Sequence, residues 1–220
     1  ANPPIPPADA PALRTEDFDY HLPEQLIAQA PARPRDAARL LVVRDGGLAD
    51  LGVLDLPSLL DPGDVLVVND TRVIPARLHG RRGAARVEIM LNRCDGGGVW
   101  QALVKNARRL RTGDVVEIEG AAGCNARVLA APEGGAVMLD FGPDQAALAA
   151  ALDAAGEIPL PPYIRRDTGP HAEDAAAYQT IFAARPGAVA APTASLHFTD
   201  RLLSALDARG IKRATVTLHV

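Results

Sequence analysis

The chain has few cysteines, few aromatic residues and no long hydrophobic run. Cys94 and Cys124 stand alone, without a C-x-x-C pair or a His/Cys cluster at metal-ligand spacing, which argues against a disulfide framework and a metal site. No stretch approaches 18 uninterrupted apolar residues, and residues 1–13 lack the basic and apolar regions of a secretion signal. We therefore expect a cytoplasmic protein that binds neither a metal nor a membrane.

Several catalytic and nucleotide-binding motifs are also missing from the sequence. It contains no G-x-x-x-x-G-K-[ST] phosphate loop and no strand-linked G-x-G-x-x-G, which argues against a nucleoside triphosphatase and a dinucleotide-dependent oxidoreductase. No G-x-S-x-G elbow or Ser/His/Asp order supports a hydrolase triad.

Basic residues are concentrated in one part of a chain whose net charge is −4. Residues 72–111 hold ten Arg or Lys against two acidic residues, so the rest of the chain is strongly acidic. Such an asymmetry is typical of a surface that binds a polyanion. The alternatives are a solvated charged surface and a contact for an acidic protein. The cations expected on this surface are Arg77, Arg81, Arg82, Lys105, Arg108, Arg109 and Arg111.

The hydrophobic fraction of 48% over 220 residues supports a packed core with secondary structure of both kinds. Near the N-terminus the pattern predicts a short helix over 22–28 and a buried strand over 39–43. The apolar run 65–68 predicts a strand covered on both faces. Later, the sequence predicts helices over 145–155, 172–182 and 200–209, the last with Thr199 as N-cap and Gly210 after its C-terminus.

Between these regions the sequence pattern changes to short runs of residues that favour β-strands, separated by turns that contain glycine. Six runs at even spacing predict a small antiparallel barrel, and they cover 73–79, 86–92, 99–105, 114–119, 125–130 and 135–141. We therefore predict an α/β fold with an inserted antiparallel six-stranded β-barrel. The expected division is a flexible tail over 1–14, a discontinuous α/β domain over 15–76 and 144–220, and the barrel over 77–143.

The run 214–220 predicts one more apolar strand, although it stands at the end of the chain where residues are usually exposed. A strand fit for a core without a following element leads us to expect an α/β domain that is incomplete at its C-terminus.

Polar residues follow the predicted strand 65–68, at the place where α/β proteins bind ligands. In the segment Asn69-Asp70-Thr71-Arg72, Asp70 is a candidate acceptor for a ribose or a base, and Arg72 is a candidate partner for a carboxylate or a phosphate. The alternative is an Asx turn capped by Arg72.

A second candidate site is the loop from Pro186 to Phe198, whose small residues let backbone groups approach a ligand closely. His197 is the candidate for proton transfer, because histidine exchanges protons near neutral pH. Pro192, Thr193 and Ser195 are candidate binding residues, and His219 is a further one. The alternatives are a connection between helices and a structural histidine.

Together these motifs resemble the S-adenosylmethionine:tRNA ribosyltransferase-isomerase family of queuosine biosynthesis. The resemblance runs from about residue 15 to the last residue and is carried by FDYHLPEQL (18–26), PGDVLVVNDTRVIPAR (62–77), VEI (87–89), PLPPYI (159–164), YQT (178–180), PGAVAAPTASLHF (186–198) and TLHV (217–220).

The resemblance implies an α/β domain with an inserted β-barrel, and it also implies a reaction. The ribosyl part of S-adenosylmethionine passes to the aminomethyl group of a 7-deazaguanine base at the wobble position of a tRNA anticodon, and epoxyqueuosine forms without a metal. The site would then contain Asp70, Thr71, Arg72, Pro192, Thr193, Ser195 and His219 as binding residues and His197 for proton transfer, with the cation cluster on the anticodon stem-loop.

Two features depart from the family pattern. Ser195 stands where the family usually has glycine, which is costly if the position needs a positive φ. Family members also continue well past TLHV. The alternative function is therefore a truncated, noncatalytic tRNA-binding remnant of the same family.

Overall fold

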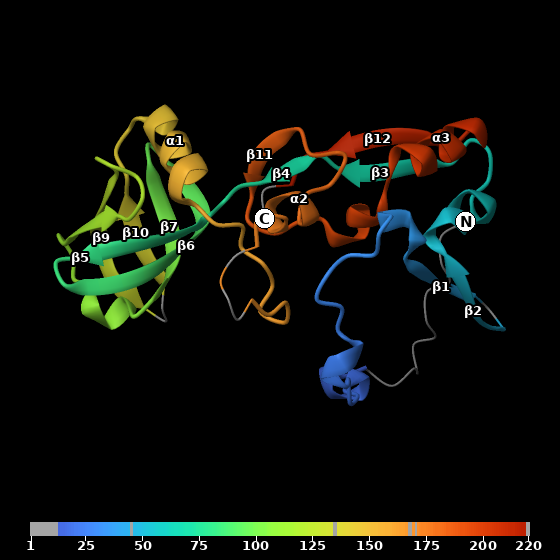
Figure 1. The fold of residues 1–220 in the computed structure, drawn as a ribbon, viewed down its shortest axis with the longest axis horizontal. Coiled ribbons are helices and arrows are strands. Elements are labelled where there is room, and N and C mark those ends of the chain that lie inside the picture. The colour runs from blue at the N-terminus through green and yellow to red at the C-terminus, as the bar shows by residue number, and fades with distance from the viewer. Residues whose placement is uncertain (1–12, 45, 134–135, 167–168, 170, 219–220) are drawn as a thin grey trace.

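The computed structural model describes residues 13–44, 46–133, 136–166, 169 and 171–218 (Figure 1). Most of the predicted tail over 1–14 therefore lies outside the described residues. A barrel occupies one end of the elongated molecule, and parallel strand pairs with short helices form the rest. This agrees with the predicted fold class. Among the described residues, no helix is both long and apolar enough to cross a membrane.

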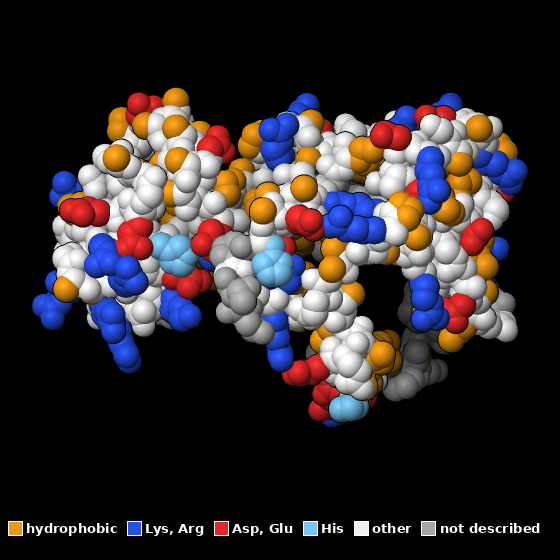
Figure 2. All heavy atoms as spheres, in the orientation of Figure 1, with side chains coloured by type: hydrophobic (Ala, Val, Ile, Leu, Met, Phe, Trp, Pro, Cys, Tyr) orange, Lys and Arg blue, Asp and Glu red, His pale blue; other side chains and the backbone are white. Residues whose placement is uncertain are grey.

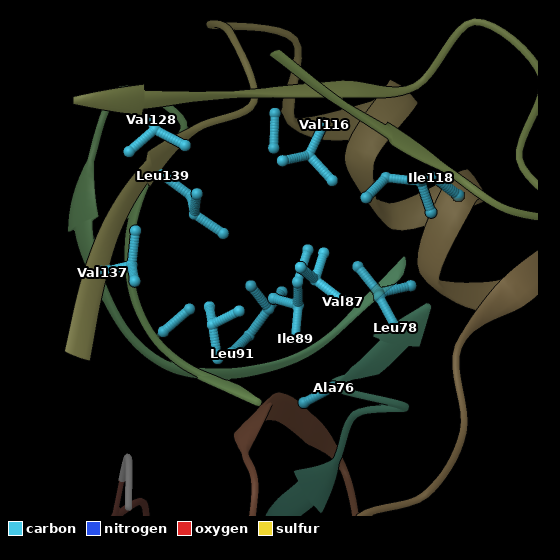
Figure 3. Close-up of a cluster of buried hydrophobic side chains, with 14 of the residues drawn as sticks. Ala76, Leu78, Val87, Ile89, Leu91, Val116, Ile118, Val128, Val137 and Leu139 are labelled. Carbon is cyan, nitrogen blue, oxygen red and sulfur yellow. The ribbon is translucent and has the colours of Figure 1, made fainter. Parts of the chain in front are cut away.

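The barrel is closed by six antiparallel strands in the order β10-β7-β6-β5-β8-β9. Their bounds are β5 Arg77–Arg82, β6 Ala85–Gly96, β7 Val99–Lys105, β8 Val115–Ile118, β9 Asn125–Glu133 and β10 Ala136–Asp140. Alternate residues point inward and form one aliphatic core, which includes Leu78, Ile89, Leu91, Val116 and Leu139 (Figure 3). The period-two alternation of these strands explains why the sequence pattern predicted them.

The rest of the molecule is built from pairs of strands that are far apart in the sequence. A hairpin joins β1 Arg39–Arg44 to β2 Gly47–Gly52, and the parallel pairs are β3 Val65–Asn69 with β12 Lys212–Val216 and β4 Thr71–Val73 with β11 Arg185–Ala188. Two small apolar clusters support them. One gathers Val53, Leu202, Leu206 and Ile211, and the other gathers Val73, Tyr178 and Ala191.

Three α-helices and six 3₁₀ turns complete the described structure. The helices are α1 Gln145–Ala155, α2 Asp174–Ala177 and α3 Asp200–Ala208. The turns are η1 Thr15–Phe18, η2 Glu24–Leu26, η3 Arg35–Ala37, η4 Val53–Leu59, η5 Ala107–Arg109 and η6 Thr193–His197.

Two of the predicted helices are confirmed with their ends. The helix α1 begins where Asp144 accepts hydrogen bonds from the backbone N–H groups of residues 146 and 147, each at 3.0 Å. In α3 the Thr199 hydroxyl accepts from the Leu202 N–H, and Gly210 follows with φ of +81°. Side-chain caps and a left-handed glycine are local signals, so the sequence alone identifies them.

Two other helix predictions are wrong in extent. Instead of a helix over 172–182, only the four residues of α2 are helical, because the chain turns at Tyr178 so that the Gln179 amide can bind the backbone of Val73. Instead of a helix over 22–28, there is only the single turn η2.

Burial along the predicted strands is lower than the sequence indicated. Leu41 and Val43 in β1 are 58% and 69% exposed, and Val65 and Val67 in β3 are 55% and 58% exposed. All five residues of β12 are exposed as well. Of the strand predicted over 214–220, the described part is extended only to Val216, β12 begins earlier at Lys212, and residues 219–220 lie outside the described residues. The reason is that β1–β2 and β3–β12 are two-stranded sheets, which the described residues cover only in part.

The barrel is joined to the rest by two segments that run side by side, residues 73–77 and 156–158. Arg77 and Glu157 exchange two backbone hydrogen bonds of 3.1 and 2.8 Å. Gly156 makes this approach possible, because a Cβ there would lie 2.1 Å from the Pro75 carbonyl oxygen. The junction is therefore fixed by the backbone.

Candidate active site

The segment Asn69–Arg72 binds two other parts of the chain. The Asp70 carboxylate accepts a hydrogen bond of 2.7 Å from the Thr217 hydroxyl, and the Asp70 carbonyl oxygen accepts from the N–H groups of Ala184 and Arg185. The Thr71 hydroxyl accepts from the Leu218 N–H at 2.9 Å and lies 2.8 Å from the Leu218 carbonyl oxygen. Asp70 and Thr71, both buried, thus hold β12 and β11 against β3 and β4.

The expected alternative for this segment, an Asx turn, is present. The Asn69 side-chain oxygen accepts a hydrogen bond of 2.9 Å from the Thr71 N–H. Arg72 is exposed. The polar groups of Asp70 and Thr71 are therefore engaged within the protein, and Arg72 keeps its guanidinium accessible.

The loop from Pro186 to Phe198 contains β11 and the turn η6, which begins after Pro192 and carries Thr193, Ser195 and His197. Ser195 is buried. Its backbone φ is not positive, since Asn106 is the one non-glycine residue with a positive φ among the described residues. The conformational cost considered for a serine at this position therefore does not arise.

Arg35 fixes η6 against the segment that follows α2. One of its nitrogens donates to the carbonyl oxygens of Gln179 and Leu196 at 2.9 and 3.2 Å, and the other donates to those of Ala176 and Ala177. Burial, followed by the nearby charge of Arg33, lowers the pKa of Arg35. These bonds make Arg35 the residue that aligns η6 with α2.

Next to Arg35 lies a pocket of about 270 Å³, which we call the tyrosine pocket. It is enclosed by residues 28–35, the segment 160–166, the end of α2 and η6, and its lining includes Leu160, Tyr163, Tyr178, Thr193, Leu196 and His197. Tyr178 is 6% exposed, and burial raises its pKa, so its hydroxyl stays protonated at neutral pH. His197 and Thr193 are therefore brought into one pocket, as their common loop suggested.

A second and larger hollow of about 840 Å³, which we call the junction cleft, lies between the barrel and the rest. Arg77 and His79 of β5 line one side, and residues within 156–166, Gly169 and residues within 171–179 line the other. His79 Nε2 lies 3.2 Å from Glu157 Oε1 across the junction. The sequence had placed Arg77 among the RNA contacts, and the structure places it in this cleft, 3.8 Å from Glu88.

The tyrosine pocket and the junction cleft share part of their walls. The four common residues are Leu160, Ile164, Arg166 and Asp174. Arg166 donates to both oxygens of Asp174, with a shortest bond of 2.7 Å, and these hydrogen bonds lower the pKa of Asp174 and raise that of Arg166. An ion pair between the buried Asp174 and the partly buried Arg166 therefore lies in the lining that the two hollows share.

Neither hollow includes Asp70, Thr71 or Arg72 in its lining. Their link to the site is indirect, because Gln179, which lines the junction cleft, exchanges two hydrogen bonds of 3.2 Å with Val73 at the end of β4. Pro192 precedes η6, and Ser195 lies within it. His219 lies outside the described residues.

Sequence reasoning missed the residues that enclose both hollows, namely Arg35, Tyr163, Arg166, Asp174 and Tyr178. Tyr163 and Tyr178 belong to PLPPYI and YQT, which carried the resemblance without being assigned a role. The sequence did offer a signal for these two residues, because the chain has only three tyrosines and two of them stand in these segments.

The predicted RNA-contacting cations divide into two groups. Arg81 pairs with Glu119, and Arg82 pairs with Asp114 at 3.1 Å and donates to the Arg109 carbonyl oxygen. The exposed group is Lys105, Arg108, Arg109 and Arg111. Figure 2 shows blue side chains projecting from the barrel end of the molecule. Among the described residues there is no group of three metal-binding side chains.

Residues 15–220 match the model of a family described as queuosine biosynthesis protein. The chain is 57% identical to an S-adenosylmethionine:tRNA ribosyltransferase-isomerase of Acidiphilium cryptum, over 94% of this chain and 60% of that protein. It is 52% identical to the protein of that name in Maricaulis maris, over 94% of this chain and 61% of the relative. The chain thus spans about three fifths of the length of these relatives.

A solved structure is also similar to this chain. It is the crystal structure of an S-adenosylmethionine tRNA ribosyltransferase from Thermotoga maritima, with 30% sequence identity and a TM-score of 0.37. The match covers 93% of this chain and 58% of that one.

Proposed function

Because this chain belongs to the queuosine biosynthesis protein family, we propose that it takes part in transferring the ribosyl group of S-adenosylmethionine to tRNA. The acceptor in this proposal is the 7-aminomethyl-7-deazaguanine base at the wobble position, and the product is epoxyqueuosine in tRNA. The observation that carries the proposal is the 57% identity, over nearly the whole of this chain, to a relative with that name. The reaction is placed in the cytoplasm, where tRNA is found.

The proposed chemistry begins at the sulfonium, which acidifies the adjacent C5′ hydrogens of the sugar. A base removes one of these protons, a C4′–C5′ double bond forms as the C4′–O4′ bond breaks, and O4′ becomes the oxygen of a C1′ aldehyde while adenine leaves with a proton. The aminomethyl nitrogen then adds to C4′ and loses a proton, the C5′ ylide so formed attacks the C1′ aldehyde, and the resulting alkoxide displaces methionine from C5′ to close the epoxide. We assign the removal of the C5′ proton to the imidazole of His197, and the proposed step involves no metal. In support, His197 is exposed in the tyrosine pocket, and its imidazole has no hydrogen-bond partner among the described residues.

The remaining residues of the proposed site surround this step. Thr193 lines the same pocket as His197, whereas Pro192 and Ser195 shape η6. Asp70 and Thr71 act by holding the strands together, and Arg72 offers a free guanidinium. His219 belongs to the proposal through its motif alone.

We further propose that the barrel, as the inserted domain over 77–143, binds the anticodon stem-loop. Arg108, Arg109 and Arg111 are exposed, and Lys105 is exposed with its ammonium 3.9 Å from Glu88, while Arg81 and Arg82 also carry structural pairs. Unpaired loop bases leave their stack at lower cost than bases in a duplex, which suits a reaction on the base itself.

The test is incubation of the 220-residue protein with S-adenosylmethionine and tRNA that carries the 7-deazaguanine precursor. We expect release of adenine and addition of the sugar to the tRNA. His197→Ala should lower kcat at least 100-fold while tRNA affinity changes less than twofold, and His21→Ala, at an exposed histidine outside both hollows, is the control.

An absence of turnover together with salt-sensitive tRNA binding would favour the noncatalytic tRNA-binding alternative. Equal losses of kcat and tRNA affinity in His197→Ala would remove the assignment of His197.

A further inference from the structure

We infer that the tyrosine pocket holds the adenosyl group of S-adenosylmethionine, and that the target base enters the adjoining junction cleft. The inference rests on the proposed function and assigns its two substrates to two hollows. It starts from the chemistry of the pocket walls.

The charged residues in the tyrosine pocket are already neutralised or engaged. Arg166 and Asp174 pair with each other, and Arg35 donates to four backbone carbonyl oxygens. A phosphate would therefore find no free guanidinium in this pocket. The pocket instead suits a ligand without negative charge.

The remaining lining is aromatic and aliphatic, with three polar side chains, those of Gln29, Thr193 and His197. Tyr163 is 51% exposed at the pocket, Tyr178 is buried, and Leu160 and Leu196 pack beside Tyr178. A flat heterocycle stacks on aromatic rings, and a sulfonium cation is attracted to their faces. The Thr193 hydroxyl has no hydrogen-bond partner among the described residues and is available to the polar edge of adenine, while the His197 imidazole, also without a partner there, is left for the C5′ proton.

The pocket is also pre-formed on its outer side. The Gln29 amide donates to the Tyr163 carbonyl oxygen at 3.0 Å and accepts from the Arg165 N–H at 2.7 Å. These bonds tie the N-terminal segment to the backbone that carries Tyr163. The backbone that carries the ring is therefore held in place before a ligand arrives, which reduces the entropic cost of binding.

The assignment of the two substrates follows from size and surroundings. At about 270 Å³ the tyrosine pocket suits one nucleoside, while the junction cleft of about 840 Å³ adjoins the barrel and its cations. Group transfer needs the sugar and the amine in contact, and the shared wall at Leu160, Ile164, Arg166 and Asp174 brings the two hollows together.

The experiment measures binding of S-adenosylmethionine and of neutral 5′-methylthioadenosine to the 220-residue protein by calorimetry. Tyr163→Ala should weaken the affinity for each of the two nucleosides by about fivefold to 150-fold, the range expected for loss of one stacking partner. Tyr163→Phe should bind within twofold of the wild type. Tyr20→Ala, at a tyrosine that is 78% exposed and outside both hollows, should change nothing.

Parallel arms separate this inference from the proposed function. Binding of an anticodon stem-loop, followed by fluorescence anisotropy, should stay within twofold in Tyr163→Ala. Adenine release with an unchanged KM for S-adenosylmethionine in that variant would overturn the inference and leave the function intact. If nucleoside binding depends on Tyr163 but no turnover on tRNA is detected, the inference is supported and the proposed function is overturned.

Two further results would also overturn the inference. One is that the wild-type protein binds neither nucleoside at millimolar concentration. The other is that free 7-aminomethyl-7-deazaguanine, and not methylthioadenosine, binds in a manner that depends on Tyr163.

Discussion

The barrel and the rest of the molecule are held together by different interactions. The barrel has one continuous aliphatic core enclosed by hydrogen-bonded strands. The rest has two small apolar clusters, and polar side chains such as Arg35, Gln29 and Gln179 bind its segments through backbone groups. The comparison indicates a stable barrel beside a site whose walls depend on a few polar bonds.

The largest expected effect is a cavity in the barrel core. Leu91 is fully buried, so Leu91→Ala should lower the free energy of unfolding by about 2–5 kcal/mol. Leu103→Ala, on the neighbouring strand and 52% exposed, should change it by less than about 0.5 kcal/mol. Urea denaturation followed by circular dichroism measures both. Equal effects of the two substitutions would contradict the single-core description.

The second prediction tests the junction between the two regions. Gly156→Ala places a methyl group 2.1 Å from the Pro75 carbonyl oxygen and 2.5 Å from that of Leu152, so the backbone must move. We expect a loss of about 1–3 kcal/mol in the free energy of unfolding. In Gly47→Ala, where the added Cβ meets nothing within 4 Å, the loss should be absent. Wild-type stability of Gly156→Ala would show that the two segments do not need this close approach.

The third prediction concerns a buried carboxylate outside the barrel. Hydrogen bonds from Arg201, followed by the one from Thr199, hold the pKa of Asp36 at about 2, below its ordinary 3.8. Because the folded pKa is lowered, this contribution to stability is complete above pH 3.8 and is lost as the pH falls toward 2. Asp36→Asn should therefore flatten the dependence of Tm on pH in that window.

Asp50→Asn is the control for Asp36, because Asp50 pairs with Arg39 on the surface. Its dependence of Tm on pH should match the wild type. If the Tm of Asp36→Asn falls between pH 3.8 and 2 as steeply as that of the wild type, the role of the Asp36–Arg201 pair is contradicted.

The smallest effect is expected on the barrel surface. Arg108→Ala should leave stability unchanged and reduce the slope of log K against log salt for anticodon stem-loop binding by about 0.7–0.9, the value of one phosphate contact. Arg39→Ala, at an exposed arginine on the hairpin β1–β2, should leave that slope unchanged. An unchanged slope in Arg108→Ala would exclude a phosphate contact at this residue.

The same contrast explains what could be predicted from the sequence. The barrel strands and the helices α1 and α3 were predicted because alternation and caps are local patterns. The end of α2 at Tyr178 was not, since it depends on Gln179 reaching the backbone of Val73 more than a hundred residues earlier. For the same reason the sequence predicted that His197 lies in a site but not that Arg35 and Tyr163 enclose it.

The paired backbone of Arg77 and Glu157 has a consequence for how the chain connects its two regions. The segment from β5 to α1 begins and ends at this pair, so the chain enters and leaves the barrel region at adjacent points. A turn of a few residues would bridge the same gap. The backbone therefore passes between the barrel and β3, β4, β11 and β12 at one place, where the two crossing segments are hydrogen-bonded to each other.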